Sequence, residues 1–464
     1  MPGILRRLAV VALVTVAAIA ASAGAAPRAE DHQGSSRGGS AGQPNVVLIV
    51  TDDQRNGLEV MPALKKRIRN GGTKYPNAFA TTPLCCPSRS SIFTGKYSHN
   101  HEVVDNQSAG QLDPTTTIQY FLRGAGYRTG IVGKYMNSVR RNGPPYFKQS
   151  AVFLSKRVNK YYYGARWVID GKKVVSPDDY STNFIQKHGQ RILKQWDEHK
   201  DGKPWFLLVA PTAPHKPFTT LPKYQKAPVS GFDPTVEEDR SDKPPFVQNS
   251  SIKPKKGIRQ RAAQYRSLMP VDAMIEKLLV TMKRLDENSN TLFIFMSDNA
   301  LMWAEHGLEK KTVPYTEAVN VPLFVKWPGH TEPGSVDERF AANIDLAPTI
   351  LDAVGISSAA EEMDGRSLLD LEWDRDRIHL EFLSNNSASG PWASTRSDTY
   401  QYTEYYGSDG IVDFREYYDM ESDAEQLVNV LEDGDPENDP TVLELAELSA
   451  QLQQDMTCSG DDCP

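Results

Sequence analysis

Cysteine is scarce in this chain, with four residues among 464, and an excess of positive charge is absent. The chain has 52 Lys and Arg against 59 Asp and Glu, which gives a formal net charge of -7. That balance argues against a general nucleic-acid binder, although it allows a local basic pocket for an anionic substrate. No internal repeats occur. A hydrophobic content of 39% and a charged content of 24% are typical of an ordinary globular protein.

The length exceeds that of one ordinary hydrophobic core. A chain of 464 residues predicts either two packed units or one large α/β unit with an appendage. Either arrangement is large enough to bury a catalytic pocket.

A long hydrophobic run is also missing, apart from a short one near the N-terminus. Arg6-Arg7 precedes the apolar stretch 8–21, and small residues follow it up to Ala26. A membrane-spanning helix needs about 20 apolar residues, and this stretch is shorter. The pattern therefore predicts that residues 1–26 are a secretory signal peptide and not the alternative, a membrane anchor. We therefore expect a secreted, extracellular protein with no membrane span after signal removal, and a flexible lead-in over residues 27–43. The export route stays open.

In an exported protein, four cysteines would ordinarily form two disulfides. Cys85 and Cys86 are adjacent, where a bridge would be strained, whereas Cys458 and Cys463 lie in a polar tail, residues 458–464, and can close a small loop. We predict a disulfide in the tail. The pair Cys85-Cys86 requires another explanation.

Continuous apolar runs predict the strands of a buried parallel sheet. They cover residues 45–51, 129–132, 205–210 and 291–296, with segments between them that are long enough for crossover helices. Residues 266–286 have the spacing of an amphipathic helix that packs on this sheet. The fold class is therefore α/β, with a large, mostly parallel sheet flanked by helices.

The pattern changes after a helix predicted to end at Gly355. Residues 377–420 alternate strand-like pieces with turns, and residues 441–456 read as a last helix, so we expect a smaller antiparallel sheet with one helix. We place a large unit at 44–355 and a smaller C-terminal α+β subdomain at 356–457. Residues 216–262, rich in Pro, Lys and Asp, are predicted to run over the surface.

Polar side chains follow these predicted strands where each strand ends. Asp52-Asp53, Lys134, His215 and Asp298-Asn299 should converge, because ligands of open α/β sheets bind outside the carboxyl ends of the strands. An isolated Asp-Asp pair is more often a strand terminator and helix cap. Oxygen ligands from separate strand ends suit Ca²⁺, with Mg²⁺ possible, better than zinc, because this set has no His or Cys cluster at ligand spacing.

Residues 85–95 read Cys-Cys-Pro-Ser-Arg-Ser-Ser-Ile-Phe-Thr-Gly. Pro87 and Ser88 suit the entry to a helix and place the preceding residue at its positive end, where an oxyanion is stabilised. Arg89 adds a fixed cation with fork geometry. A buried structural cysteine beside a helix start is the alternative for Cys85, and a small buried thiol is the expectation for Cys86.

The 85–95 segment resembles the signature of the type I sulfatases, formylglycine-dependent members of the alkaline phosphatase superfamily. The resemblance implies that a formylglycine-generating enzyme oxidises Cys85 to an aldehyde, whose hydrate attacks the sulfur of a sulfate ester. It implies Asp298 as the base, His215 or Lys311 as the group that protonates or stabilises the leaving oxygen, and Arg89 as a further catalytic cation. The residues it implies for the divalent cation are Asp52, Asp53, Asp298 and Asn299, with Cys85 against the ion, and those for the sulfate group are Lys134, His215 and Lys311.

The resemblance runs from Asn45 to Asn429, so the large unit would be the catalytic domain. The segments 84–101 and 133–137 are similar to the branch that contains N-acetylglucosamine-6-sulfatases and heparan 6-O-endosulfatases, which implies a sulfated sugar of the glycosaminoglycan kind as substrate. Three alternatives stay open: an arylsulfatase of broad specificity, a phosphonate or phosphodiester hydrolase of the same superfamily, and a non-catalytic binder of sulfated glycans. The pocket walls, which would decide the substrate, are expected from residues 161–166, residues 216–262 and the C-terminal sheet.

Two positions depart from the family pattern. Many arylsulfatases have a histidine where this chain has Met136, so Asn137, His99 or His101 is a candidate to replace it as a base. The usual glycine after the Asp-Asn pair is Ala300 here, which affects the loop and removes no ligand.

Overall fold

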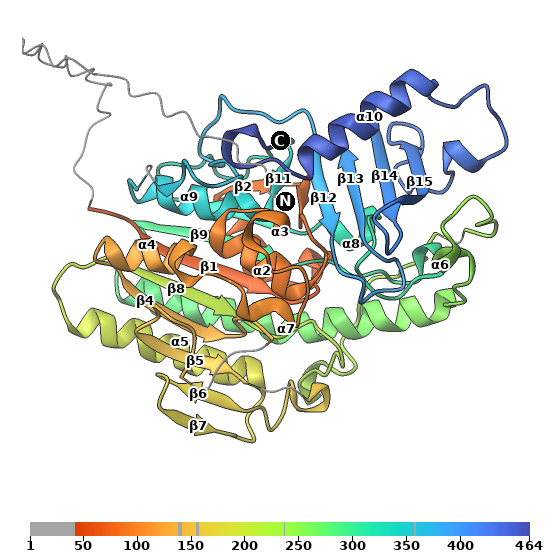
Figure 1. Cartoon of the computed structure of the whole chain (residues 1–464). Coiled ribbons are helices and arrows are strands. Elements are labelled where there is room, and N and C mark those ends of the chain that lie inside the picture. The colour runs from red at the N-terminus through yellow and green to blue at the C-terminus, as the bar shows by residue number, and fades with distance from the viewer. Residues whose placement is uncertain (1–41, 138–141, 155–156, 236, 357–358) are drawn as a thin grey trace, which may run out of the picture. The chain divides into compact units, whose positions relative to one another are not determined.

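A nine-stranded sheet forms the centre of the fold (Figure 1). The computed structural model describes residues 42–137, 142–154, 157–235, 237–356 and 359–464. The predicted signal peptide and residues 27–41 of the predicted lead-in lie outside the described residues. Strand β1 (Asn45–Thr51) is buried along almost its whole length and pairs in parallel with β8 (Trp205–Ala210) and β9 (Thr291–Ser297).

The other strands extend the sheet on both sides in the order β2-β10-β9-β1-β8-β4-β5-β6-β7. β4 and β5 continue the parallel part, whereas β10 is antiparallel to β9 and β2, and β6 is antiparallel to β5 and β7. These strands are β2 (Thr73–Tyr75), β4 (Arg128–Gly133), β5 (Gln149–Phe153), β6 (Trp167–Ile169), β7 (Lys173–Val175) and β10 (Leu323–Lys326). The sheet is therefore mixed, with a parallel centre and antiparallel edges.

Helices cover both faces of this sheet, as Figure 1 shows. Because β1 alternates its side chains, Val46, Leu48 and Val50 pack in one core with α2 (Cys85–Thr94), α4 (Ile118–Gly124) and α9 (Leu346–Ala353). Val47 and Ile49 pack in the other core with α1 (Pro62–Arg67), α5 (Ser181–Glu198) and α7 (Pro254–Arg284). The predicted helix at 266–286 is the second half of α7.

A separate antiparallel sheet follows in the last part of the chain. It consists of β12 (Ile378–Phe382), β13 (Trp392–Arg396), β14 (Tyr400–Tyr406) and β15 (Val412–Asp419), in that order. Helix α10 (Val442–Asp455) lies across it in Figure 1, and Leu452 packs on Ala393 and Tyr402. The predicted α/β class, with a small antiparallel C-terminal sheet and one helix, is confirmed.

The prediction of a surface excursion over residues 216–262 is wrong in part. Helix α7 begins at Pro254, so the last residues of that stretch are its first turns, and Lys243 is buried, with its Nζ donating to Tyr418 Oη at 2.8 Å. Proline suits the first turn of a helix because its missing N–H would have no helical partner there. The remaining short elements are α3 (Ser98–His101), α6 (Pro245–Gln248), α8 (Thr316–Val319), β3 (Ala78–Phe79) and β11 (Ala341–Ala342).

No helix within the described residues is both long enough and apolar enough to cross a bilayer.

Candidate active site

The carboxyl ends of four parallel strands bring the predicted polar residues together. Asp52 and Asp53 directly follow β1, Lys134 follows β4, and Asp298 follows β9. His215 lies in the loop after β8. Gly133 permits this arrangement, because a Cβ at its position would lie 1.9 Å from the carbonyl oxygen of Ala210.

Cys85 is the first residue of helix α2 and is almost fully buried. Its Sγ donates to Asp52 Oδ1 at 3.4 Å and accepts from Lys311 Nζ at 3.0 Å. Burial raises the pKa of the Cys85 thiol to about 12. The unmodified side chain is therefore a neutral thiol at ordinary pH, which is a weak nucleophile.

Cys86, the neighbour, points into the apolar core beside α2. Its backbone N–H donates to Asn106 Oδ1 at 3.0 Å, and its Sγ accepts from the backbone N–H of Asn137 at 3.3 Å. The structure thus gives the two adjacent cysteines different surroundings, one polar and one packed.

Three buried carboxylates, Asp52, Asp53 and Asp298, place one oxygen each within 4.8 Å of one another. Burial on its own would raise the pKa of Asp52, but the charges of Lys134 and His215 hold that pKa below its ordinary value. Burial would also raise the pKa of Asp53, but nearby positive charge, mainly that of Lys311, lowers it. At Asp298 the effect of burial is larger than that of the neighbouring cations, so its pKa is raised.

These oxygens fit a divalent cation. Asn299 joins them, because its Nδ2 donates to Asp53 Oδ1 at 2.8 Å and its Oδ1 accepts from Lys311 Nζ at 3.2 Å. Carboxylate and amide oxygens in a buried cluster are the ligands that Ca²⁺ and Mg²⁺ prefer. A second group of possible metal ligands consists of Asp52, Cys85 and His215, whose ligand atoms also lie within 4.8 Å of one another. Because both groups contain Asp52, residue 85 lies next to the oxygen cluster.

Two lysines pair with the carboxylates. Lys134 Nζ donates to Asp52 Oδ2 at 2.7 Å, and Lys311 Nζ donates to Asp53 Oδ1. Burial would lower the pKa of Lys134, but the charge of Asp52 raises it above the ordinary value, and Asp53 has the same effect on Lys311. Both lysines therefore remain charged and can hold an anion.

Arg89 occupies the next turn of α2, with no exposed surface. Its Nε donates to Asp298 Oδ2 and its Nη1 donates to the carbonyl of Lys134, both at 2.8 Å. Its Nη2 has no hydrogen-bond partner among the described residues. The guanidinium thus orients Asp298 and leaves one N–H group free.

His215 is half-buried at the mouth of the site. Its Nδ1 donates to the carbonyl of Lys216 at 2.7 Å, and its Nε2 lies 3.8 Å from Asp53 Oδ2. Because a carbonyl can only accept, Nδ1 carries the proton of the neutral ring. Nε2 is then free to gain and pass on a proton.

A cavity of about 720 Å³ opens over Asp53, His215 and Lys311. Its walls come from both the first residues and the later part of the 216–262 stretch, from residues 308–313 and from residues 385–389, which connect β12 to β13. The predicted contribution of residues 216–262 is confirmed, and the C-terminal sheet contributes through a loop between two of its strands, whereas the predicted residues 161–166 do not line this cavity. The 385–389 segment itself could not be found from the sequence, since it has neither a motif nor a periodic pattern.

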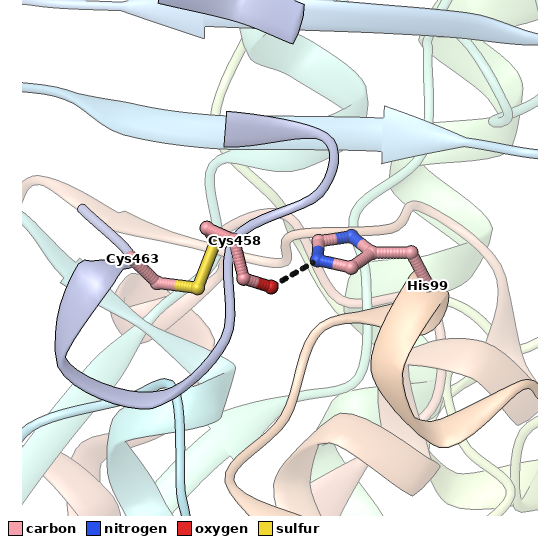
Figure 2. Close-up of side chains that lie close together, drawn as sticks. All are labelled: His99, Cys458 and Cys463. Atoms are coloured by element: carbon pink, nitrogen blue, oxygen red, sulfur yellow. Dashed lines mark hydrogen bonds between the residues drawn. A yellow bond between two sulfur atoms is a disulfide. The ribbon is translucent and has the colours of Figure 1, made fainter. Parts of the chain in front are cut away.

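Two of the three candidates offered to replace the histidine at Met136 are not brought to the site. Figure 2 shows His99 directed at the C-terminal tail, where its Nε2 lies 3.1 Å from the carbonyl oxygen of Cys458, and its Nδ1 lies 2.9 Å from Glu381 Oε2. His101 Nε2 lies 3.1 Å from Ser91 Oγ, and its Nδ1 accepts from the backbone N–H of Val103. Both rings have both nitrogens engaged away from Cys85, so the proposal of either as a base was wrong.

Asn137 is different, since its buried Oδ1 has no partner among the described residues. Its backbone N–H is bound to Cys86 rather than to Cys85.

The tail that His99 contacts carries a disulfide between Cys458 and Cys463.

Asn343 is a structural residue of the site that the sequence did not indicate. Its Nδ2 donates to Ser88 Oγ at 2.9 Å, and the Ser88 hydroxyl in turn donates to the carbonyl of Asp298. These bonds tie the first turn of α2 to the end of β9. A single asparagine outside any motif gives no signal in one sequence.

Comparison with known proteins identifies the family. The family model described as Sulfatase matches residues 44–356, and the one described as N-sulphoglucosamine sulphohydrolase, C-terminal, matches residues 304–455. Human N-acetylglucosamine-6-sulfatase is 29% identical to this chain over 483 residues, which covers 91% of this chain and 86% of the human protein.

Two solved structures show how widely the fold is shared. A protein in complex with its substrate D-glucosamine-2-N,6-O-disulfate has a TM-score of 0.77 at 20% identity, covering 89% of this chain and 97% of that one. The phosphonate monoester hydrolase of Agrobacterium radiobacter has a TM-score of 0.70 at 21% identity, covering 89% and 95%. The family match over 44–356, together with the human relative, shows that this chain belongs to the sulfatase family and is a sulfuric ester hydrolase.

Proposed function

We propose that this sulfatase is exported and removes the 6-O-sulfate of N-acetylglucosamine in sulfated glycans, with a formylglycine made from Cys85 and with Ca²⁺ or Mg²⁺ as its cation. The human relative, whose name states this substrate, supports the sugar, since it aligns over nearly the whole chain. The observation that carries the site is the placement of Cys85 Sγ between Lys311 Nζ and Asp52.

The cation would be held by the oxygens of Asp52, Asp53, Asp298 and Asn299, where it would polarise the sulfate and the nucleophile. A cation there would offset much of the negative charge of three buried carboxylates, which pair with Lys134, Lys311 and Arg89. Oxidised and hydrated, residue 85 would present an oxygen nucleophile, which explains why a thiol with a raised pKa is buried beside anionic and cationic groups.

The protein's own side chains would bind and orient the ester. Lys134 and Lys311 remain charged, Lys134 is paired with Asp52 beside residue 85, and Lys311 Nζ contacts Cys85 Sγ, so their ammonium groups can hold the sulfate oxygens. Arg89 fixes Asp298, which would accept the proton of the nucleophile. His215 Nε2 can donate a proton to the departing sugar oxygen.

The first experiment assays the purified protein on a panel of defined sulfated sugars and 4-nitrophenyl sulfate. Release of sulfate from N-acetylglucosamine 6-sulfate, faster than from N-acetylglucosamine 3-sulfate or glucosamine N-sulfate, is the expected result. Sulfate release from other sugars alone would refute the substrate assignment.

A phosphonate or phosphodiester hydrolase is the second candidate, because the phosphonate monoester hydrolase shares the fold over most of both chains. The same metal, nucleophile and cations would serve a phosphoryl group. The ratio of kcat/KM for 4-nitrophenyl sulfate and an aryl phosphodiester discriminates the two, and a faster phosphodiester would favour the second candidate.

A non-catalytic binder of sulfated glycans would keep the pocket and bind these sugars without turnover. In that case Cys85 would remain a thiol in protein from the native host.

A further inference from the structure

The mouth of the 720 Å³ cavity carries lysines that the reaction at residue 85 does not use. Lys216 and Lys310 both line this cavity and are both exposed. Lys216 follows His215 in the chain, and Lys310 precedes Lys311. Since His215 and Lys311 both approach Asp53, each free lysine lies one residue from a group at the reacting centre.

Neither lysine is neutralised by the cavity itself. The two carboxylates that line it are already paired, Asp53 with Lys311 and Glu309 with Lys256. In the described part of the chain, no carboxylate lies within ion-pair distance of the ammonium of Lys216 or Lys310. The mouth therefore carries two positive charges in surplus.

Hydrogen-bonding groups lie on the same wall. Ser387 Oγ is 2.7 Å from Thr312 Oγ1, and Ser389 Oγ donates to the carbonyl of Thr312 at 2.8 Å, so the 385–389 segment is fixed against the residue after Lys311. Asn385 is exposed beside them. Amide and hydroxyl groups next to cations suit a sugar that carries an anion.

We propose that Lys216 and Lys310 bind a second anionic group of the substrate, a sulfate or a carboxylate, in addition to the sulfate that is hydrolysed. This inference rests on the proposed function and specifies its substrate class as sulfated glycans with at least two anionic groups. The second anion would come either from an N-sulfate on the same sugar or from a uronate on the neighbouring sugar.

The test compares three substrates of equal 6-O-sulfation. They are N-acetylglucosamine 6-sulfate with one anionic group, glucosamine 2-N,6-O-disulfate with two on one sugar, and a disaccharide that joins a uronate to N-acetylglucosamine 6-sulfate. At low salt we expect kcat/KM for one of the doubly charged substrates to exceed that for the first by about ten-fold. The substrate that is preferred identifies the source of the second anion.

The double variant Lys216→Ala/Lys310→Ala should lower that ratio by about ten-fold, because it removes both surplus charges. The matched control is Lys226→Ala, an exposed lysine of the same surface stretch that does not line the cavity, and it should leave the ratio unchanged. The wild-type ratio should also fall as salt is added. Equal kcat/KM values in the wild type, or a double variant that keeps the ratio, would overturn the proposal.

Calorimetric binding to Cys85→Ala separates this inference from the proposed function, because it requires no turnover. Tighter binding of a doubly charged sugar, lost in the lysine double variant, supports the anion site even if the wild type hydrolyses none of the three. Turnover of all three without any preference refutes the anion site and leaves the proposed function intact.

Discussion

The role of His215 can be tested by comparing substrates with different leaving groups. If its Nε2 protonates the departing oxygen, His215→Ala should lower kcat/KM for a sugar 6-sulfate by about 10²- to 10⁴-fold, because an alkoxide leaves poorly without a proton. The same variant should lower kcat/KM for 4-nitrophenyl sulfate much less, since a nitrophenolate needs no proton.

His199→Ala, which changes an exposed histidine after helix α5, is the control and should affect neither substrate. Equal losses on both substrates would remove the acid role from His215 and leave it a binding residue.

The buried side chain of His101 should make the stability of the protein depend on pH. Burial lowers its pKa to about 4, whereas an unfolded histidine titrates near 6.5. Because the unfolded state then binds more protons, the folded state loses stability as the pH falls from about 6.5 towards 4, by roughly 3 kcal/mol at most.

His101→Gln cannot titrate, so its free energy of unfolding should vary less between pH 7 and pH 4.5 than that of the wild type. Urea titrations of both proteins at several pH values measure this difference. Parallel pH profiles would show that His101 does not remain neutral in the folded protein.

Helix α2 ends at a glycine that its surroundings require. Gly95 has φ 69°, and a Cβ there would lie 2.7 Å from Met363 Sδ, so Gly95→Ala should lower the free energy of unfolding by about 1–3 kcal/mol. Gly124 in α4 has open space around it, and Gly124→Ala should be neutral or stabilising by up to about 1 kcal/mol. Urea unfolding of both variants tests the comparison, and similar effects would contradict it.

The central elements could be predicted because their patterns are strong. β1 is an apolar run that ends at Asp52-Asp53, and the predicted bounds of β1 and β8 agree with the structure. β5, β6 and β7 were not predicted, since they have only three to five residues each and lie at one edge of the sheet. The start of α7 was missed because its first turns carry exposed lysines and a glycine.

The site was predictable wherever its residues follow strands or belong to the 85–95 motif. Parallel strands end at the same edge, so Asp52, Lys134 and Asp298 had to meet there. Asn343 and the 385–389 segment could not be foreseen, because they reach the site through contacts between distant parts of the chain. The prediction for His99 failed for the same reason, since Glu381 engages its ring, whereas the ring of His101 is engaged by Ser91 nearby in the sequence.

The protein as a whole should depend on its cation for stability. Three buried carboxylates within 4.8 Å repel one another, so a cation that binds only the folded state should raise the melting temperature. At a hundred-fold excess over Kd this linkage contributes about 2.7 kcal/mol. Thermal unfolding with and without Ca²⁺ measures it, and chelation should reverse the gain.

Asp298→Asn removes one of these charges and should weaken the dependence on Ca²⁺. Glu309→Gln, which changes a carboxylate of the cavity wall outside the cluster, should leave it unchanged. A melting temperature that does not respond to Ca²⁺ or Mg²⁺ in the wild type would contradict the proposed cation site.

The catalytic roles assigned to the site depend on what residue 85 becomes. Peptide mass spectrometry of active protein from its native host measures this directly. The expected result is an aldehyde in place of the thiol at residue 85, with Cys86 still a thiol and Cys458 still bridged to Cys463. An intact thiol at Cys85 in protein that hydrolyses sulfate esters would contradict the account.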